Sequence, residues 1–189
     1  MTIEPLTAER WDDFVELFSR RGPRGGSRNA PAYGCWCMYW RDRTLAHGEP
    51  KKRAMEKIVR DGREPGLLAY EGGSPVGWIS IAPRAELTAL CASPQYGPRD
   101  EDDGVWSIVC FVVDKPARRR GVASALIDAA VAYAFVHGAS AVEAYPHASD
   151  PRDSMGNRAL YEGAGFTKLR DANKRVVVRS SHSLRLSAQ

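Results

Sequence analysis

The chain has 189 residues, of which 43% are hydrophobic and 26% charged, a composition that fits a globular domain and excludes a disordered or fibrous protein. Its net charge of +4 comes from basic residues scattered among 23 acidic ones, so we expect no nucleic-acid partner. The segment Met1–Pro5 lacks the basic start of a signal peptide, and no apolar run reaches bilayer-spanning length. We therefore expect a cytoplasmic protein without a membrane partner.

The first part of the chain predicts two helices joined by an irregular segment. Thr7 can cap a helix that stops at Gly22, and residues 22–34 are too rich in glycine to nucleate regular structure. A second helix is predicted over 50–61, because proline suits a first helical turn and Gly62 ends the pattern. The apolar face of the first helix holds Trp11, Phe14, Val15 and Phe18.

Residues 66–82 predict a hairpin. The strands 66–70 and 76–82 flank Gly72 and Gly73, and paired glycines accept the positive φ angles of a tight turn. The following stretch, 83–104, is polar and rich in proline, aspartate and arginine, so we expect an irregular excursion over the surface.

The apolar centre of the sequence predicts a strand, helix, strand unit. Residues 105–113 are nearly continuously apolar and rich in β-branched side chains, as in a central strand covered on both faces. Residues 122–137 are apolar almost all round and predict a helix buried against the sheet, ended by Gly138. The next strand, 139–145, should then lie parallel to 105–113.

The C-terminal part predicts one more helix and one more strand. Ser154 can cap a short helix that reaches Glu162, with Gly163 and Gly165 as its end. The triple valine at 176–178 predicts the last strand, and the final ten residues are expected to form a tail.

The segment between the central strand and the buried helix, Arg118–Ser124, has the features of a phosphate site. Gly121 and Ala123 let a ligand approach the first helical turn, whose unpaired N–H groups and dipole favour an anion. Three arginines add charge and forked donors. The spacing matches neither a P-loop nor a dinucleotide fingerprint, which disfavours a nucleoside triphosphate or NAD. A tight turn carrying a solvated basic run is the competing interpretation.

This Arg-x-x-Gly-x-Ala loop after an apolar strand, followed by Asn157 and the ending Tyr161–Phe166, resembles the GNAT superfamily of acyl-CoA-dependent N-acyltransferases. The resemblance covers 67–178; Ala123 stands where many members have glycine, and its methyl group still allows a close approach. It implies a single α/β (α+β) domain over 1–189, with a mixed, mostly antiparallel, twisted sheet, a central splayed parallel pair and flanking helices. Residues 1–65 would form the acceptor side, 66–179 the sheet and CoA-binding core, and 180–189 a tail.

The resemblance also implies a reaction and its residues. Acetyl-CoA would give its acetyl group to a primary amine of a small molecule or peptide by direct attack in a ternary complex, with Tyr161 as the acid that protonates the leaving thiolate. The groups implied to hold acetyl-CoA are the backbones of Phe111, Val112 and Val113, the loop residues Arg118, Arg119, Arg120, Gly121, Val122, Ala123 and Ser124, and the side chain of Asn157.

The general base and the acceptor pocket stay open. Candidates for the base are Glu143, His147, Asp102 and Asp103, although each is more typical of a structural or solvated position. The aromatic segment 35–41 lies where proteins of this type build the acceptor pocket, and it could equally be core. A non-catalytic acyl-CoA-binding or regulatory module is the alternative function, and the oligomeric state, monomer or homodimer, is not determined by any pattern.

The four cysteines predict reduced thiols and no metal. Cys35 and Cys37 are one residue apart while Cys91 and Cys110 stand alone, which is the spacing of neither a disulfide framework nor a zinc ribbon. Zinc held by Cys35, Cys37, Cys91 and a histidine is disfavoured because the pair lacks a matching second pair.

Overall fold

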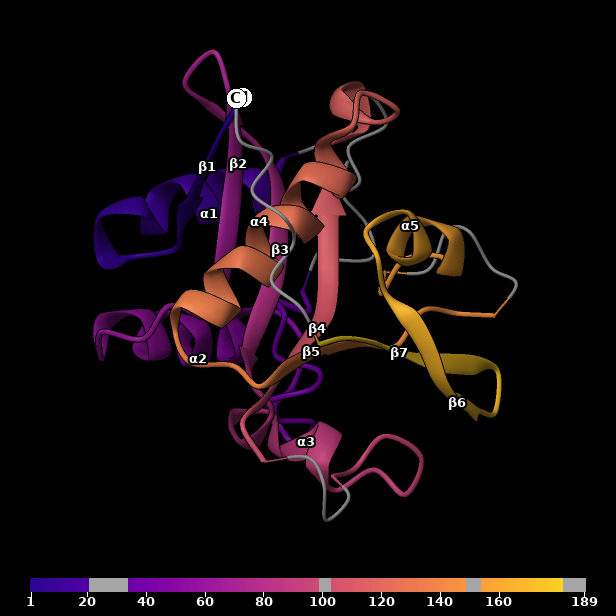
Figure 1. Ribbon diagram of the computed structural model, residues 1–189. Coiled ribbons are helices and arrows are strands. Elements are labelled where there is room, and N and C mark those ends of the chain that lie inside the picture. Colours follow the sequence, from indigo (N-terminus) through magenta and orange to yellow (C-terminus); the bar gives the residue numbers. More distant parts are fainter. Residues whose placement is uncertain (21–33, 99–102, 149–153, 182–189) are drawn as a thin grey trace.

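A computed structural model of the chain describes residues 1–20, 34–98, 103–148 and 154–181, and these form one seven-stranded sheet with helices on both faces (Figure 1). The strands are β1 (Thr2–Pro5), β2 (Gly66–Glu71), β3 (Ser74–Pro83), β4 (Val105–Val113), β5 (Ala141–Ala144), β6 (Thr167–Ala172) and β7 (Arg175–Ser180). The α-helices are α1 (Trp11–Ser19), α2 (Glu49–Arg60), α3 (Thr88–Cys91), α4 (Val122–Val136) and α5 (Arg158–Gly163), and 3₁₀ helices lie at Ala8–Arg10 (η1), Arg84–Glu86 (η2) and Lys115–Ala117 (η3).

The strand order β1-β2-β3-β4-β5-β7-β6 confirms the mixed sheet with a parallel pair at its centre. All neighbouring strands are antiparallel except β4 and β5, which are parallel from the pair Val105 and Ala141 to the pair Ile108 and Ala144. Beyond that point β4 runs on to Val113 without β5, so the two strands splay apart (Figure 1).

The register of β4 against β3 slips at the same place. Ser80 lies opposite Cys110 while Ile81 lies opposite Ile108, so Val109 is an extra residue on β4. Such a bulge bends a strand and increases its local twist. The bulge and the splay together turn the last residues of β4 away from β5, so these residues have no strand partner on that edge.

Alternating side chains of the sheet divide the core between the two faces. On β2 and β3, Leu67 and Ile79 pack against α4, whereas Leu68 and Trp78 pack against α1 and α2. Figure 1 shows α4 crossing one face of the sheet, over β2 to β4. The nearly continuous apolar run of β4 is explained by this arrangement, because both of its faces are covered.

The N-terminal helix differs in detail from the prediction. It begins at Trp11 after the 3₁₀ turn η1, and Thr7 forms no side-chain capping bond. Val15 is only half-buried and Leu17 takes its place in the core. The predicted stop at Gly22 and the glycine-rich segment lie outside the described residues. Strand β1 was not predicted, because four residues are too few to show a period.

The hairpin prediction is confirmed, but the surface excursion is partly wrong. Gly72 and Gly73 have φ angles of 56° and 78° and form the turn between β2 and β3. The stretch 83–104 contains η2 and α3; Leu87 between them and Leu90 in α3 are fully buried. Those two leucines hold the stretch against the sheet even though its remaining sequence is polar.

Three elements of the C-terminal half are corrected by the structure. Strand β5 is shorter than 139–145, and β7 is longer than the triple valine. Helix α5 is capped by Asn157, whose Oδ1 accepts from the N–H of Leu160 at 3.0 Å, and not by Ser154. Strand β6 was missed because it is a mostly exposed edge strand without an apolar period. Among the described residues, no helix is long and apolar enough to cross a bilayer.

Candidate active site

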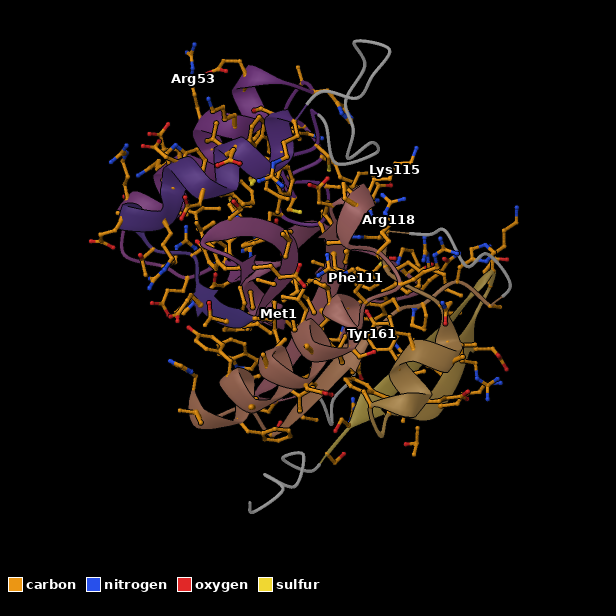
Figure 2. All side chains as sticks on the ribbon, turned by 90° about the horizontal axis from the view of Figure 1, so that it is seen from above. Met1, Arg53, Phe111, Lys115, Arg118 and Tyr161 are labelled. Carbon is orange, nitrogen blue, oxygen red and sulfur yellow. The ribbon has the colours of Figure 1, made fainter. Side chains whose placement is uncertain are left out.

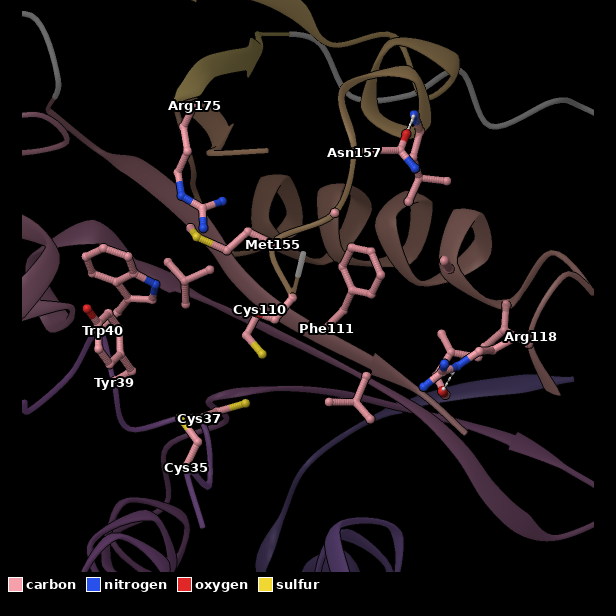
Figure 3. A pocket seen from close by; sticks show the side chains of 18 of the residues that line it. Cys35, Cys37, Tyr39, Trp40, Cys110, Phe111, Arg118, Met155, Asn157 and Arg175 are labelled. Atoms are coloured by element: carbon pink, nitrogen blue, oxygen red, sulfur yellow. Dashed lines mark hydrogen bonds between the residues drawn. The ribbon is translucent and has the colours of Figure 1, made fainter. Parts of the chain in front are cut away.

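The splay between β4 and β5 opens into a cavity of about 1410 Å³. Typical ligand pockets have about 300–1,000 Å³, so this cavity has room for more than one small substrate. Its floor is the last part of β4, from Val109 to Val113. The start of α4, the segment before α5, and the N-terminal segment after residue 34 form the other walls (Figure 3).

The predicted phosphate loop forms one end of the cavity. Gly121 has a φ of 82°, which turns the chain into α4, and the first helical bond there runs from the N–H of Ala125 to Gly121 O at 3.0 Å. The N–H groups of Val122, Ala123 and Ser124 therefore lie in the first turn, where a helix has no carbonyl to offer them. All three residues line the cavity, so an anion there would meet these donors and the positive end of the helix dipole.

The three arginines of the loop have different positions. Arg118 lines the cavity and donates its Nε–H to the carbonyl of Val113 at 3.0 Å (Figure 3). Arg119 also lines it and holds a φ of 62°, a strained conformation for a residue with a side chain. Arg120 is not in the wall; its side chain is 59% exposed and pairs with Glu71 at 3.0 Å.

The predicted pantetheine-binding edge of β4 lies on the cavity floor. Phe111, Val112 and Val113 all line it. The N–H of Phe111 donates to the carbonyl of Ser154 at 2.9 Å, so this donor already has a protein acceptor. Beyond Ile108, β5 no longer pairs with β4. On that side of β4, backbone groups can therefore form hydrogen bonds with another extended group.

Of the two residues predicted from the sequence, Asn157 faces the cavity and Tyr161 lies in the core behind its wall. Asn157 lines the cavity, with its Oδ1 used for the cap of α5. Tyr161 is fully buried, packs against Phe166 with ring centroids 5.3 Å apart, and does not line the cavity. It lies just behind Phe111 and Gly156, since a Cβ on Gly156 would meet the Phe111 ring at 2.8 Å and the Tyr161 ring at 3.0 Å.

Glu143, a candidate base, is part of a buried ion cluster instead. It is fully buried, contacts the guanidinium of Arg84, and accepts from Arg179 Nε at 2.9 Å. It does not line the cavity, so we assign it a structural role.

The other candidate bases are no better placed. His147 forms isolated bridges with Asn157 and Arg175 and is not a lining residue. Asp103 is exposed at the start of β4 and also stays outside the wall, while Asp102 lies outside the described residues.

The aromatic segment 35–41 is both core and wall. Trp36 is 6% exposed and stacks on Phe18 with ring centroids 5.5 Å apart, so it is core. Cys35, Cys37, Tyr39 and Trp40 line the cavity. Two consecutive residues with positive φ, Trp36 at 48° and Cys37 at 53°, form the turn that sends side chains in both directions.

Burial affects the protonation of two thiols in the cavity wall, those of Cys35 and Cys37. Burial raises the pKa of Cys37 well above its ordinary value, and burial also raises the pKa of Cys35. Trp78 donates its indole N–H to Cys37 Sγ at 3.0 Å. Within the residues that the structure places, no group of three His, Cys, Asp or Glu side chains is suited to hold a metal ion.

Several lining residues were not predicted from the sequence. Arg43, His47, Tyr96 and Arg175 come from loops or from the start of β7, and only the fold brings them to one cavity. Arg43 could have been predicted as a lining residue, because it is only a few residues from Tyr39 and Trp40 in the chain.

Comparison with known proteins identifies the family of the chain. Residues 32–166 match the family model described as the acetyltransferase (GNAT) family. No curated protein sequence matches the chain.

Solved structures share the fold at low identity. The ribosomal-protein-alanine N-acetyltransferase from Brucella melitensis is 16% identical, with a TM-score of 0.56 over 95% of this chain and 97% of that chain. The ribosomal-protein-S18-alanine N-acetyltransferase from Escherichia coli is 12% identical, with a TM-score of 0.54 over 100% and 97% of the two chains. AAC(6')-Ib in complex with ribostamycin and coenzyme A is 15% identical, with a TM-score of 0.61 over 100% and 98%. With a splayed parallel pair and a family match over most of its length, the chain belongs to the acetyltransferase (GNAT) family.

Proposed function

We propose that this protein transfers an acetyl group from acetyl-CoA to a primary amine within a ternary complex. The observation that carries the proposal is one continuous cavity that joins the phosphate loop, the open edge of β4 and the aromatic segment after residue 34. A similar fold occurs in N-acetyltransferases for ribosomal-protein alanine and in an aminoglycoside acetyltransferase, which supports a nitrogen acceptor.

The residues of the cavity fit acetyl-CoA. Its pyrophosphate would lie on the N–H groups of Val122, Ala123 and Ser124, with Arg118 and Arg119 supplying charge. The pantetheine arm, which is extended and carries amides, suits the β4 edge at Phe111–Val113 and would exchange hydrogen bonds with it in place of the Ser154 carbonyl.

The chemical step follows from that placement. The lone pair of a neutral amine attacks the thioester carbonyl, the carbon becomes tetrahedral, and a backbone N–H of β4 stabilises the oxyanion. The C–S bond then breaks, the amide remains, and the nitrogen gives up a proton while the CoA sulfur gains one. The protein therefore has to bind the amine in its neutral form and to supply a proton near the sulfur.

Tyr161 stays our proposal for that proton donor. Its ring is fully buried beside Phe111 and Gly156 and does not line the cavity, so the proposed role requires a change in the wall that brings the hydroxyl to the sulfur. If it acts as the acid, Tyr161→Phe lowers kcat by about 10²-fold, the lower end of the usual effect of general acid catalysis, with little change in the affinity for acetyl-CoA. If it is only a core residue, the same variant lowers stability and leaves kcat unchanged.

Calorimetry with acetyl-CoA tests the binding half of the proposal. A hydrogen bond to a charged group contributes about 1.5–3 kcal/mol, so Arg118→Gln should weaken binding about 10- to 100-fold. Arg120→Gln is the matched control, because this side chain pairs with Glu71 outside the wall, and less than about a twofold change is expected. Equal losses in both variants would contradict the different roles given to Arg118 and Arg120, and no loss in Arg118→Gln would contradict the loop assignment.

Release of the CoA thiol in the presence of a panel of amines tests the transfer half. Thiol release that depends on an amine supports the enzyme. Tight binding of acetyl-CoA without amine-dependent release would instead favour a non-catalytic acyl-CoA-binding module.

A further inference from the structure

Three aromatic rings and Arg43 lie at the end of the cavity opposite the phosphate loop, on the side where Arg175 also lines the wall (Figure 3). Tyr39 and Trp40 meet edge to face with ring centroids 4.9 Å apart, and Tyr96 lies 5.6 Å from Trp40 in the same manner. The guanidinium of Arg43 lies 4.5 Å from the centre of the Trp40 ring and 4.7 Å from that of Tyr39. All four residues line the cavity, and we call them the aromatic end.

Arg43 holds an available positive charge at this end. It makes no ion pair with any residue that the structure describes, and its side chain is exposed. The Cζ of Arg43 lies over both rings, and because the side chain is exposed, its N–H donors stay accessible to a ligand. None of the described lining residues is aspartate or glutamate, so a ligand anion at Arg43 would compete with no carboxylate among them.

Acetyl-CoA is not expected to supply that anion. Its pyrophosphate belongs with Arg118 and Arg119, and Figure 3 shows Arg118 at one end of the cavity and Tyr39 and Trp40 at the other. Cys110 and Phe111 lie between the two ends, on the strand proposed to hold the thioester (Figure 3). The aromatic end is thus on the acceptor side of the reacting carbonyl.

We propose that the acceptor is an amine that also carries a planar apolar group and a carboxylate, with the ring packed on Tyr39, Trp40 and Tyr96 and the carboxylate bound by Arg43. This inference rests on the proposed acetyl transfer and adds the class of acceptor to it. A polyamine is disfavoured, because its additional charges would meet a cation and no described carboxylate.

The same charge helps the reaction. A cation near the acceptor lowers the pKa of its ammonium group, because two positive charges repel each other. A larger share of the acceptor is then neutral and able to attack at neutral pH. Arg43 is therefore an acceptor-binding residue, and it also favours the reactive form of the amine.

Matched pairs of amines test the inference on the full chain. L-tryptophan is compared with tryptamine, and para-(aminomethyl)benzoate with benzylamine, so that each pair differs only in the carboxylate; spermidine represents a polyamine. At saturating acetyl-CoA, we expect the acid of at least one pair to have a kcat/KM about tenfold higher, mainly through KM, as for one charge-assisted hydrogen bond. Spermidine should be the poorest acceptor.

Variants connect the preference to one side chain. Arg43→Gln should abolish the difference within the pair, and Arg43→Lys should keep part of it, because the charge remains. Arg53→Gln is the control: this arginine on α2 is 76% exposed, pairs with Glu49, and points away from the Phe111 and Arg118 region (Figure 2).

Two outcomes separate this inference from the proposed function. If neither acid is a better acceptor than its partner amine, or if spermidine releases thiol at least as well as both acids, acetyl transfer stands and the acceptor class is wrong. If acetyl-CoA does not bind, the proposed function fails, and calorimetry of the acids alone, with and without Arg43→Gln, still tests the aromatic end. The inference is wrong if the acid and its partner amine have the same turnover and the same affinity in both pairs.

Discussion

Gly156 lies where the cavity wall meets the core, and replacing it by alanine is the sharpest test of the packing described above. Its φ of 82° lies in the left-handed region, which costs a residue with a Cβ about 1–2 kcal/mol. The added Cβ would lie 2.8 Å from Cε1 of Phe111 and 3.0 Å from Cε2 of Tyr161. Overpacking of this kind costs about 1–3 kcal/mol. Together we expect Gly156→Ala to lower the free energy of unfolding by about 2–5 kcal/mol.

Gly138→Ala separates the two contributions. Gly138 has a φ of 84°, close to that of Gly156, but no atom lies within 4 Å of its ideal Cβ. It should therefore lose only the backbone part, about 1–2 kcal/mol.

Urea unfolding of both variants measures these losses as shifts of the midpoint at unchanged slope. The difference between the variants is the cost of moving the rings of Phe111 and Tyr161. Because Phe111 lines the cavity, Gly156→Ala should also change the affinity for acetyl-CoA, whereas Gly138→Ala should not. A Gly156→Ala protein that is no less stable than Gly138→Ala would refute the packing of these rings.

Two further variants probe groups that the sequence suggested for catalysis. Glu143→Gln removes the charge that the buried Arg84 and Arg179 contact, so we expect a loss of about 3–5 kcal/mol in urea unfolding; a stable variant with reduced kcat would reverse its structural assignment. Asn157→Ala should lose about 1 kcal/mol because the N–H of Leu160 loses its cap, and Asn157→Asp should keep that cap. If the amide nitrogen of Asn157 binds acetyl-CoA, the Asn157→Asp variant should have a lower affinity for acetyl-CoA in calorimetry although it keeps the cap. An unchanged affinity would exclude that contact.

Much of the sheet could be predicted because its physical signals are local. The apolar run of β4 and the apolar helix α4 can only be buried, and a parallel neighbour follows from the right-handed strand, helix, strand connection. The paired glycines of the first hairpin have one suitable conformation. Strands β1 and β6 were missed because they lie at the sheet edges, where one is short and the other mostly exposed, so neither shows an apolar period.

The candidate site divides in the same way. The phosphate loop depends on a few consecutive residues, so its position after β4 could be read from the chain. The role of each arginine in the loop could not be predicted from the chain. Arg120, for example, pairs with Glu71, which lies in a hairpin nearly fifty residues earlier in sequence.

Sequence alone determined the family and the parallel pair and led to the proposed phosphate loop, because each depends on a short stretch with a strong local preference. Tertiary structure decided which groups face the cavity. It buried Glu143 between two arginines and Tyr161 behind Phe111, and it brought Arg43 and Tyr96 to the same end. These placements depend on contacts between residues far apart in the chain, and no local pattern encodes which side of a wall a side chain will face.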